Sequence, residues 1–402
     1  MNKFHYFLNK ISTKIAVNLI YGKNYKNLNK MQYCKKCLMP DTRPGIIFNE
    51  GVCSACIHYE KRKTTDWDKR LKELKDLCDK YRNSNGNEYD CAISISGGKD
   101  SHFQTYYIKE VMKMNPVLLT VGNTDWTETG RKNLDNISDV FGCDIIELKP
   151  NRRVCRIMMK KAFEDIGQPT WYIDSLIYTY PYRMAMQLDV KLLVYGEDVN
   201  YNYGGKYTEE TQSAMLQPTN DVVRPYLKKW LDGEITEKDL ESTKPPTIEK
   251  CKKHGLEPIF LSYFVPWDSH HNYEVAKRWG FRHIGHEYVR ENTLENYNQI
   301  DSLGYLMNQY LKYPKFAHSA ATEMASRWIR ARLKTREEMI PFVKEYDKKL
   351  DQVVVDKFCE FTGLSTREFW KILDKWYNRE FFEQDKDGVW HEKFEVGKGL
   401  IK

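Results

Sequence analysis

The sequence predicts an α/β fold: a parallel sheet with helices on both faces, preceded by a small cysteine ribbon and followed by a helical region. Three observations predict it. From residue 89 onward, short apolar runs alternate with stretches of helical spacing, which is typical of repeated strand–helix units. Two Cys-x-x-Cys pairs precede this part, and from about residue 291 the spacing becomes helical. We therefore expect an accessory extension at 1–30, a ribbon at 31–60 and a linker helix at 61–88. A sheet domain at 89–290 and a helical domain at 291–402 follow.

Composition and charge exclude several classes of protein. The 402 residues carry a net charge of +7, which is too balanced to demand a nucleic-acid partner. No apolar run approaches the ~18 residues of a membrane-spanning helix, so we expect no transmembrane segment. Of the 10 cysteines, four form the two pairs and the others are scattered. That distribution fits metal binding in a reducing cytoplasm better than it fits disulfides.

Residues 1–30 contain lysines but no acidic residue, and their apolar residues have mostly helical spacing. A basic amphipathic helix of this kind can contact a membrane surface or a partner protein. Met31 immediately precedes the cysteine module and is a plausible alternative start. We therefore interpret 1–30 as an accessory extension and not as a targeting signal.

The two cysteine pairs have the spacing of a zinc ribbon. In such a ribbon, each Cys-x-x-Cys turn presents two thiolates, and two turns close a tetrahedron around Zn²⁺. A site with four thiolates leaves no position for water, so the predicted role is structural. A redox dithiol or chance pairing is the alternative. The predicted ligands are Cys34, Cys37, Cys53 and Cys56.

The strongest motif follows the first predicted strand, at 91–96. Its two glycines let the backbone approach an anion, and the helix expected at 101–114 supplies N–H donors. Serine hydroxyls, a lysine cation and a carboxylate able to hold Mg²⁺ complete a phosphate cradle. The glycine and lysine residues of this motif do not have the spacing of a Walker P-loop, so a P-loop of that type is excluded. The alternative to a phosphate cradle is an ordinary glycine turn after a strand. The cradle consists of Ser96, Gly97, Gly98, Lys99, Asp100 and Ser101.

Further strands are predicted at 117–121, 144–148, 191–195 and 259–264, with a second helix at 130–141. Because ligands bind at the carboxyl ends of parallel strands, we expect the loops after these strands to meet the phosphate cradle. Val121, Gly122 and Gly196 are candidates for contact with a nucleotide. Ordinary polar loops are the alternative. The candidates for contact with a polar substrate are Asp125, Trp126, Glu197, Asp198, Tyr203 and Trp267.

Two arginines in the helical region are also substrate candidates. Arg327 and Arg330 share a polar stripe of the helix expected at 320–334, opposite an apolar stripe. A solvated charged face explains this stripe as well as an anion-binding face does. Residues 335–402 offer turn signals and amphipathic helices without recognisable chemistry.

The cradle resembles the pyrophosphate loop (PP-loop) of ATP pyrophosphatases, which have a Rossmann-like sheet of the adenine nucleotide alpha-hydrolase type. A wider ordered set resembles the N-acetyl sugar amidotransferase family of bacterial surface-polysaccharide and flagellar glycan pathways, including O-antigen and pseudaminic and legionaminic acid pathways. The resemblance covers roughly residues 31–345. It rests on the ribbon, the cradle, Tyr195-Gly-Glu-Asp198, Tyr263-Phe-Val-Pro-Trp-Asp268 and the stretch 313–340.

This resemblance implies that ATP adenylates the N-acetyl carbonyl of a sugar and that ammonia then replaces the oxygen, giving an acetamidino group. Lys99, Asp100 and Ser101 are then the catalytic residues, and Asp100 holds Mg²⁺. The four paired cysteines hold a structural Zn²⁺. No cysteine has the flanking residues of a glutaminase nucleophile, so we expect a separate glutaminase subunit to supply the ammonia.

Two other functions are compatible with parts of the pattern. A tRNA thiolation enzyme can pair a PP-loop with N-terminal zinc knuckles, but it usually needs further cysteines, often in another Cys-x-x-Cys pair. No such pair follows Cys56. A non-catalytic ribbon scaffold whose nucleotide site only regulates assembly is the other alternative.

Overall fold

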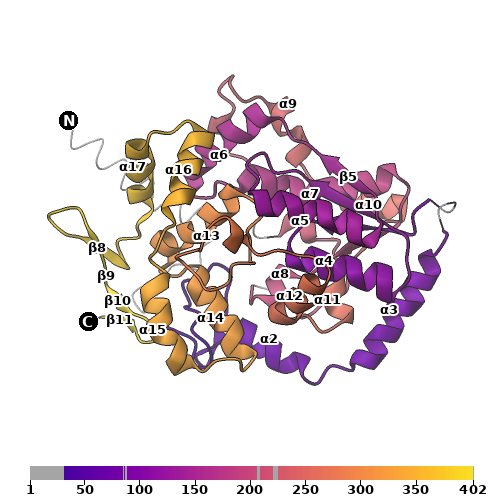
Figure 1. Ribbon diagram of the computed structural model, residues 1–402, viewed down its shortest axis with the longest axis horizontal. Helices are drawn as coiled ribbons and strands as arrows, with labels where there is room; N and C mark the ends of the chain where they lie inside the picture. The colour runs from indigo at the N-terminus through magenta and orange to yellow at the C-terminus, as the bar shows by residue number, and fades with distance from the viewer. Residues whose placement is uncertain (1–30, 85, 87, 206–208, 221–224, 402) are drawn as a thin grey trace.

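A five-stranded parallel sheet forms the centre of the chain, as predicted, and helices lie on both sides of it (Figure 1). The computed structural model describes residues 31–84, 86, 88–205, 209–220 and 225–401. The strand order is β5-β4-β3-β6-β7. The strands are β3 (Cys91–Ile95), β4 (Pro116–Val121), β5 (Ile145–Leu148), β6 (Leu192–Tyr195) and β7 (Glu257–Phe260). The chain therefore runs from β3 to one edge of the sheet and returns to the other side of β3 at β6.

Two groups of helices cover the sheet. On one face lies α7 (Trp171–Gln187), and on the other lie α3 (Trp67–Tyr81), α4 (Lys99–Thr105), α5 (Glu128–Phe141) and α12 (Ser269–Arg278). The connections contain α6 (Arg152–Ile166), α8 (Val199–Asn202), α9 (Glu237–Leu240), α10 (Ile248–His254) and α11 (Leu261–Phe264). Helices on both faces are the arrangement that a parallel sheet requires.

Because both faces are covered, the strands are mostly apolar and show no regular alternation of apolar and polar residues. All residues of β4 are buried. Neighbouring side chains point to opposite faces: Ile93 and Leu118, which are paired in register, pack toward α4 and α5. Ala92 and Leu119 pack toward α7. The core of this part therefore consists of two apolar layers on either side of the sheet.

The structure corrects three predicted boundaries. The helix predicted from Ser101 begins at Lys99 and continues from Tyr106 to Val111 as a π-helical segment, η2 (Tyr106–Val111). The helix predicted from Gly130 begins at Glu128, because the Thr127 side chain accepts a hydrogen bond from the Gly130 N–H. The strand predicted at 259–264 ends at Phe260 and continues as α11.

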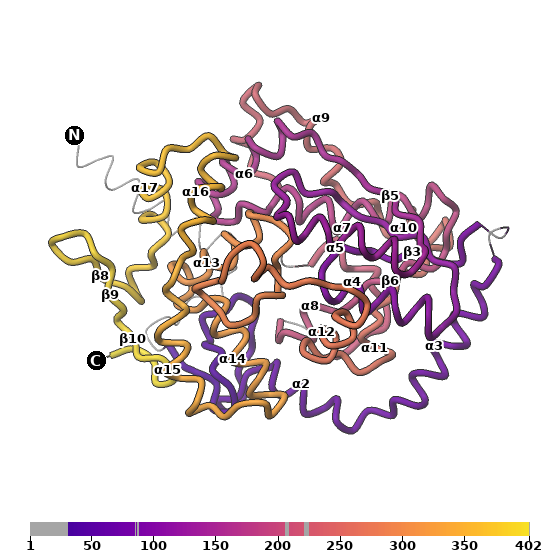
Figure 2. Tube along the Cα trace, viewed as in Figure 1, coloured from indigo at the N-terminus to yellow at the C-terminus, as the bar shows by residue number. Residues whose placement is uncertain are grey.

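The helical C-terminal region, also predicted, packs against the sheet domain through α6. Figure 2 shows its orange and yellow segments on the side of the molecule opposite α3. At the contact, Phe163 of α6 is fully buried and stacks on Phe369, and its carbonyl accepts the indole N–H of Trp376. The helices are α13 (Leu303–Phe316), α14 (Ala320–Arg330), α15 (Arg336–Tyr346), α16 (Gln352–Thr362) and α17 (Thr366–Trp376). They are followed by two small hairpins, β8 (Phe382–Gln384) with β9 (Trp390–Glu392) and β10 (Phe394–Glu395) with β11 (Gly399–Leu400).

The N-terminal ribbon consists of a hairpin, β1 (Phe48–Asn49) and β2 (Val52–Cys53), followed directly by α2 (Ser54–Arg62). It lies against α14, as Figure 1 shows, with Leu38 packed between Met324 and Met339. A turn at Glu50 and Gly51, both with positive φ, closes the hairpin. The accessory extension predicted at 1–30 lies outside the described residues.

None of the helices in the described part of the chain is both long enough and apolar enough to cross a membrane.

Replacing Phe163 with alanine removes a fully buried ring at the contact between α6 and the C-terminal helices. We expect the free energy of unfolding to fall by ~3–5 kcal/mol, because the substitution loses burial and leaves a cavity. Urea denaturation followed by circular dichroism measures it. Val140→Ala, at an exposed position of α5, is the matched control and is expected to change stability little. A Phe163→Ala protein as stable as the control would contradict this packing.

Candidate functional site

The predicted phosphate cradle lies where the strand order reverses. The loop after β3 and the loop after β6 leave neighbouring strands whose onward connections run to opposite sides of the sheet. In open α/β sheets such a position is the usual binding crevice. The Gly196 carbonyl also accepts the Ser262 N–H, so the chain after β7 reaches the same crevice. The loops after β3, β6 and β7 therefore meet at one place.

The cradle itself is tightly folded. Gly97 has φ +93°, and a Cβ there would lie only 3.1 Å from Leu134, so this position requires glycine. The Ser96 N–H donates to the Ser101 hydroxyl at 2.9 Å, which closes the loop on the first turn of α4. The His102 side chain also contacts the loop, with its Nδ1 3.1 Å from the Gly98 carbonyl oxygen. These contacts hold the loop in one defined conformation.

Charged side chains crowd around the cradle. Lys99 is almost fully buried and pairs with the Asp100 carboxylate at 2.5 Å, and Asp100 also accepts a hydrogen bond from Asn272 at 2.8 Å. Burial and the nearby Asp100 charge raise the pKa of Glu197 to about 7, although Lys99 opposes that rise. A fourth charged group, Asp301, was not predicted. Burial raises its pKa to about 7 as well, against Ser96 and Lys99, which lower it.

Asp301 comes from the C-terminal region, immediately before the cap of α13, where Ser302 accepts the Tyr305 N–H. Its carboxylate lies beside the cradle, with Oδ1 3.8 Å from the place of a Cβ on Gly98. In the sequence it is an ordinary acidic residue before a helix cap. Only the tertiary structure brings it to a loop some two hundred residues earlier.

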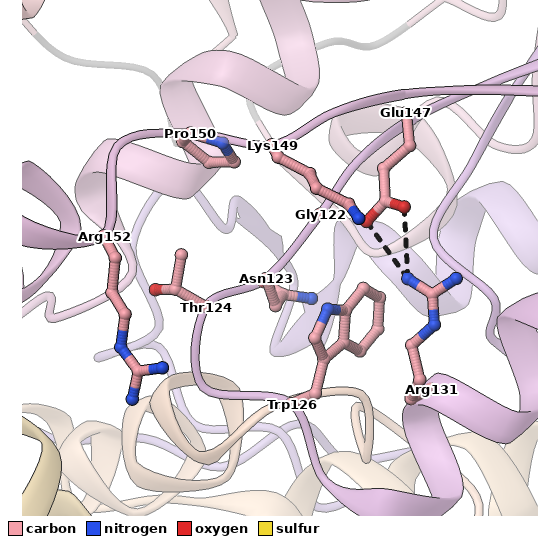
Figure 3. Close-up of a pocket in the computed structure, with 9 residues that line it drawn as sticks. All are labelled: Gly122, Asn123, Thr124, Trp126, Arg131, Glu147, Lys149, Pro150 and Arg152. Atoms are coloured by element: carbon pink, nitrogen blue, oxygen red, sulfur yellow. Dashed lines mark hydrogen bonds and ion pairs between the residues drawn. The ribbon is translucent and has the colours of Figure 1, made fainter.

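A first cavity, of about 480 Å³, lies at the carboxyl ends of β4 and β5 (Figure 3). Gly122 and Trp126 line it, as do Arg131 and Glu147, which are joined by two hydrogen bonds of 3.1 Å. The Arg131 guanidinium lies 5.8 Å from the centre of the Trp126 ring. The remaining lining residues are Asn123, Thr124, Lys149, Pro150 and Arg152. The cavity therefore combines an aromatic wall with a mostly basic rim.

A second cavity, of about 260 Å³, lies between the ribbon helix α2, the loops after β6 and β7, and α14. It brings together four of the residues predicted to contact substrate: Tyr203, Trp267, Arg327 and Arg330. Sequence reasoning missed its ribbon side. That side and the rest of the lining consist of His58, Tyr59, Arg62, Lys63, Trp67, Asn202, Pro266, Asp268 and Ser269.

Three residues that line this second cavity carry buried hydrogen-bond donors without partners. Asn202 Nδ2, Trp267 Nε1 and Arg327 Nε are buried, and none has an acceptor within the described residues. A buried donor without a partner costs ~1–3 kcal/mol, so such atoms at a cavity indicate a ligand with acceptor oxygens. The basic side chains Arg62, Lys63 and Arg330 outnumber the single acid, Asp268, in the lining.

The two arginines of α14 are held in place by buried partners. Arg327 donates to Glu295 at 2.6 Å, and although burial opposes its charge, this guanidinium lowers the pKa of Glu295. Arg330 lies 3.9 Å from the Cys37 sulfur of the ribbon. The polar stripe of α14 is therefore not a solvated face. It joins the cysteine ribbon to the cavity wall.

One pair of side chains connects the second cavity to the cradle. The Tyr203 hydroxyl donates to Glu197 at 3.3 Å, which places the wall of the second cavity beside the charged groups of the cradle. Trp267 also packs over Gly196, where a Cβ would meet its ring at 2.9 Å. Val121, the last residue of β4, leads into Gly122 in the first cavity.

Three predicted substrate residues lie elsewhere. The Asp125 carboxylate is buried and accepts the Gly304 N–H at 2.7 Å, so it fastens the start of α13. Asp198 is buried and caps α8 by accepting the Asn200 N–H at 2.9 Å. Trp126 lines the first cavity and not the second. Acidic residues at strand ends indicate ligand contact and helix capping equally well, so the sequence could not separate the two roles.

The four paired cysteines converge as predicted. Their sulfur atoms all lie within 4.8 Å of one another, with Cys34 to Cys56 at 3.9 Å and Cys37 to Cys53 at 3.7 Å. A tetrahedron of ~2.3 Å Zn–S bonds has sulfur separations of ~3.8 Å, so the four thiols fit a structural Zn²⁺. Backbone N–H groups of Cys37 and Cys53 also point at the Cys34 sulfur. Such contacts stabilise thiolates.

Comparisons with known proteins match separate parts of the chain. Residues 291–395 match the family model described as "LPS biosynthesis protein WbpG-like, C-terminal domain". An uncharacterized protein, MJ1599, of Methanocaldococcus jannaschii is 24% identical over 172 residues, which are 42% of this chain and 60% of that protein. The chain thus matches only about 60% of the length of this curated relative.

Two solved structures have weak overall similarity. The NMN synthetase from Francisella tularensis has a TM-score of 0.31 and 10% identity, covering 74% of this chain and 94% of that one. The U34-tRNA thiolase NcsA from Methanococcus maripaludis, solved with its [4Fe-4S] cluster, has a TM-score of 0.29 and 14% identity, covering 83% and 96%.

The reversal of strand order with a Ser-Gly-Gly-Lys-Asp-Ser loop at its centre defines an α/β nucleotide-binding fold of the PP-loop type. The region 291–395, which includes Asp301 and α14, is similar to the C-terminal domain of WbpG-like lipopolysaccharide (LPS) biosynthesis proteins. This match supports the resemblance to surface-polysaccharide enzymes that the sequence suggests.

Replacing Cys53 with serine should remove the metal and destabilise the ribbon, because structural zinc sites contribute on the order of 10 kcal/mol to folding. We expect one zinc per chain in the wild type and little in the variant, as measured by elemental mass spectrometry, together with a lower melting temperature. Cys359→Ala, a buried cysteine outside the cluster, should keep its zinc. Zinc retained by Cys53→Ser at the wild-type level would contradict the four-thiolate site.

Proposed function

We propose that this chain is an ATP-dependent, AMP-forming amidotransferase that converts the N-acetyl group of a sugar into an acetamidino group. One observation carries the proposal: the cradle adjoins, through Glu197 and Tyr203, a cavity with unpartnered N–H donors. A nucleotide and an oxygen-rich acceptor can therefore lie side by side. The match of residues 291–395 to LPS biosynthesis proteins supports a sugar as the acceptor.

The proposed reaction requires the ATP and the acceptor sugar to bind next to each other. The acetamido oxygen attacks the α-phosphorus of ATP, the bond to pyrophosphate breaks, and an adenylated imidate forms. Ammonia then bonds to the acetamido carbon, the carbon–oxygen bond breaks, and the oxygen leaves as part of AMP while a proton is released. Without adenylation, the acetamido oxygen is a poor leaving group, so ammonia cannot displace it.

The residues at the cradle suit the first step. In this proposal, backbone N–H groups of the loop, the Lys99 ammonium and the Ser96 and Ser101 hydroxyls stabilise the charge of the departing pyrophosphate. When bound, Mg²⁺ supplies further charge neutralisation, and the Asp100 carboxylate is its proposed ligand. The first cavity, with Gly122 and Trp126 in its wall, is the proposed position of the adenosine.

In the second cavity, the acceptor sugar would satisfy the free donors. Trp267 offers both an indole N–H and a ring face, and sugars commonly pack on such rings. Tyr203 and Arg327 add a hydroxyl and a guanidinium on the side of the cradle. These contacts would hold the acetamido group toward the α-phosphate, which is the orientation that the first step needs.

The ammonia is proposed to come from a separate glutaminase subunit. All 10 cysteines of the chain are buried, so none is available as the nucleophile of an internal glutaminase. Burial raises the pKa of the six cysteines outside the ribbon, for example that of Cys78 to about 12 and that of Cys143 to about 11. Thiols of this kind are poor sulfur carriers. This speaks against the alternative of tRNA thiolation.

Purified protein with ATP, Mg²⁺, ammonium and a panel of N-acetylated sugars should release AMP and pyrophosphate and yield a sugar in which NH replaces one oxygen. Lys99→Ala should lower the rate by ~10²–10³, because it removes a preorganised cation from the cradle. Lys132→Ala, at an exposed position of α5, is the control. Release of AMP that depends on tRNA and a sulfur donor, with no turnover of any sugar, would overturn the proposal.

Trp267→Phe removes the unpartnered indole N–H and keeps an aromatic ring in the second cavity. We expect the KM for the sugar to rise about two- to tenfold, since a neutral hydrogen bond contributes ~0.5–1.5 kcal/mol, while the KM for ATP stays unchanged. Steady-state kinetics with each substrate varied in turn measures this. If only the KM for ATP rises, Trp267 does not contact the sugar and the sugar binds outside the second cavity.

A further inference from the structure

We infer that Asp301, supplied by the C-terminal region, is a ligand of the divalent cation that accompanies the nucleotide at the cradle. This inference rests on the proposed function, because it assumes that ATP binds there. It concerns a residue that no motif of the loop contains. It also assigns to the C-terminal region a direct part in the ATP site.

The first support is an atom without a partner. Asp301 is only 8% exposed, and its Oδ1 accepts no hydrogen bond from any residue that the structure describes. Burying a carboxylate oxygen without a partner is costly, so its persistence indicates a ligand that the polypeptide does not supply. The oxygen lies 3.8 Å from the place of a Cβ on Gly98, so this carboxylate faces the cradle.

The second support is the balance of charge. At the cradle, the Asp100 carboxylate repels the carboxylates of Glu197 and Asp301, and the Lys99 ammonium attracts both of them. Three carboxylates beside one ammonium would repel a polyphosphate. A divalent cation resolves the conflict, since carboxylate and phosphate oxygens are the ligands that Mg²⁺ prefers.

The third support is the way in which Asp301 is held. The Asp301 carbonyl accepts the Thr127 N–H at 3.1 Å, and the Thr127 hydroxyl donates to the Ile300 carbonyl at 2.6 Å. Asp125 accepts the N–H groups of Leu303 and Gly304. The backbone of Asp301 also lies so close to Gly130 that a Cβ there would approach its carbonyl oxygen to 2.4 Å. Such fixed positioning is what a metal ligand needs.

These contacts give Asp125 a role that the sequence did not predict. Its carboxylate and carbonyl fasten the segment 300–304 and thereby position Asp301 at the cradle. Asp125 is therefore a positioning residue for the proposed metal ligand.

The test uses Mn²⁺ as the probe and α,β-methylene-ATP as a nucleotide that cannot be cleaved between its α and β phosphates. Free Mn²⁺ is followed by electron paramagnetic resonance during titration of the zinc-loaded full chain. Asp301→Asn keeps the shape of the side chain but removes its charge and replaces one acceptor oxygen with an NH₂ donor. We expect it to weaken Mn²⁺ binding about 10-fold or more. Asp139→Asn, at an exposed position of α5, should bind like the wild type.

The outcomes separate the inference from the proposed function. If the wild type binds no Mn²⁺–nucleotide complex, the proposed ATP site fails. If the wild type and Asp301→Asn bind it equally, the assignment of Asp301 fails while the ATP site stands.

A measurement on the wild type avoids any folding defect of the variant. With aspartate labelled with ¹³C at its carboxyl group, electron–nuclear double resonance should detect two carboxylates coupled to Mn²⁺, from Asp100 and Asp301. Coupling to a single aspartate that persists unchanged in Asp301→Asn would overturn the inference.

Discussion

The structure depends most on the hydrogen-bonded seam between the loop after β4 and the start of α13. Asp125 and Thr127 supply its side-chain hydrogen bonds, and a short bridge pairs Trp126 with Ser302. Because these groups are buried, each hydrogen bond that is lost would leave an unsatisfied partner in a medium of low dielectric. The seam fixes the C-terminal region to the sheet domain at the edge where the phosphate cradle lies. It therefore decides where Asp301 stands, and the chain that leaves it through α13 leads to α14 in the cavity wall.

The cysteine ribbon has two structural consequences. Its helix α2 begins directly after Cys53 and presents His58, Tyr59 and Arg62 to the second cavity. On the other side, Arg330 of α14 lies against the Cys37 sulfur. A bound metal would fix both elements, because the cluster cannot keep its geometry without fixing its flanking segments. The ribbon is therefore a part of the cavity wall as well as an anchor for the N-terminal segment.

The two halves of the site differ in electrostatic character. The cradle gathers three carboxylates around Lys99, a composition that suits a nucleotide with its divalent cation. The second cavity is basic and has free N–H donors, a composition that suits an acceptor rich in oxygen. Glu197 and Tyr203 lie at the boundary between them.

The sequence by itself determined the parallel sheet, the cradle and the four-cysteine cluster, because each depends on short-range pattern: buried strands are mostly apolar, glycine is required at positive φ, and paired cysteines have a fixed spacing. It also selected Tyr203, Trp267, Arg327 and Arg330, which the fold brings into one cavity. Only the tertiary structure showed that Asp125 and Asp198 accept backbone N–H groups at helix starts and that Asp301 lies beside the cradle, since the three are alike as residue types. Their roles depend on which distant backbone N–H groups or loops come near them, and that is set by packing over long range.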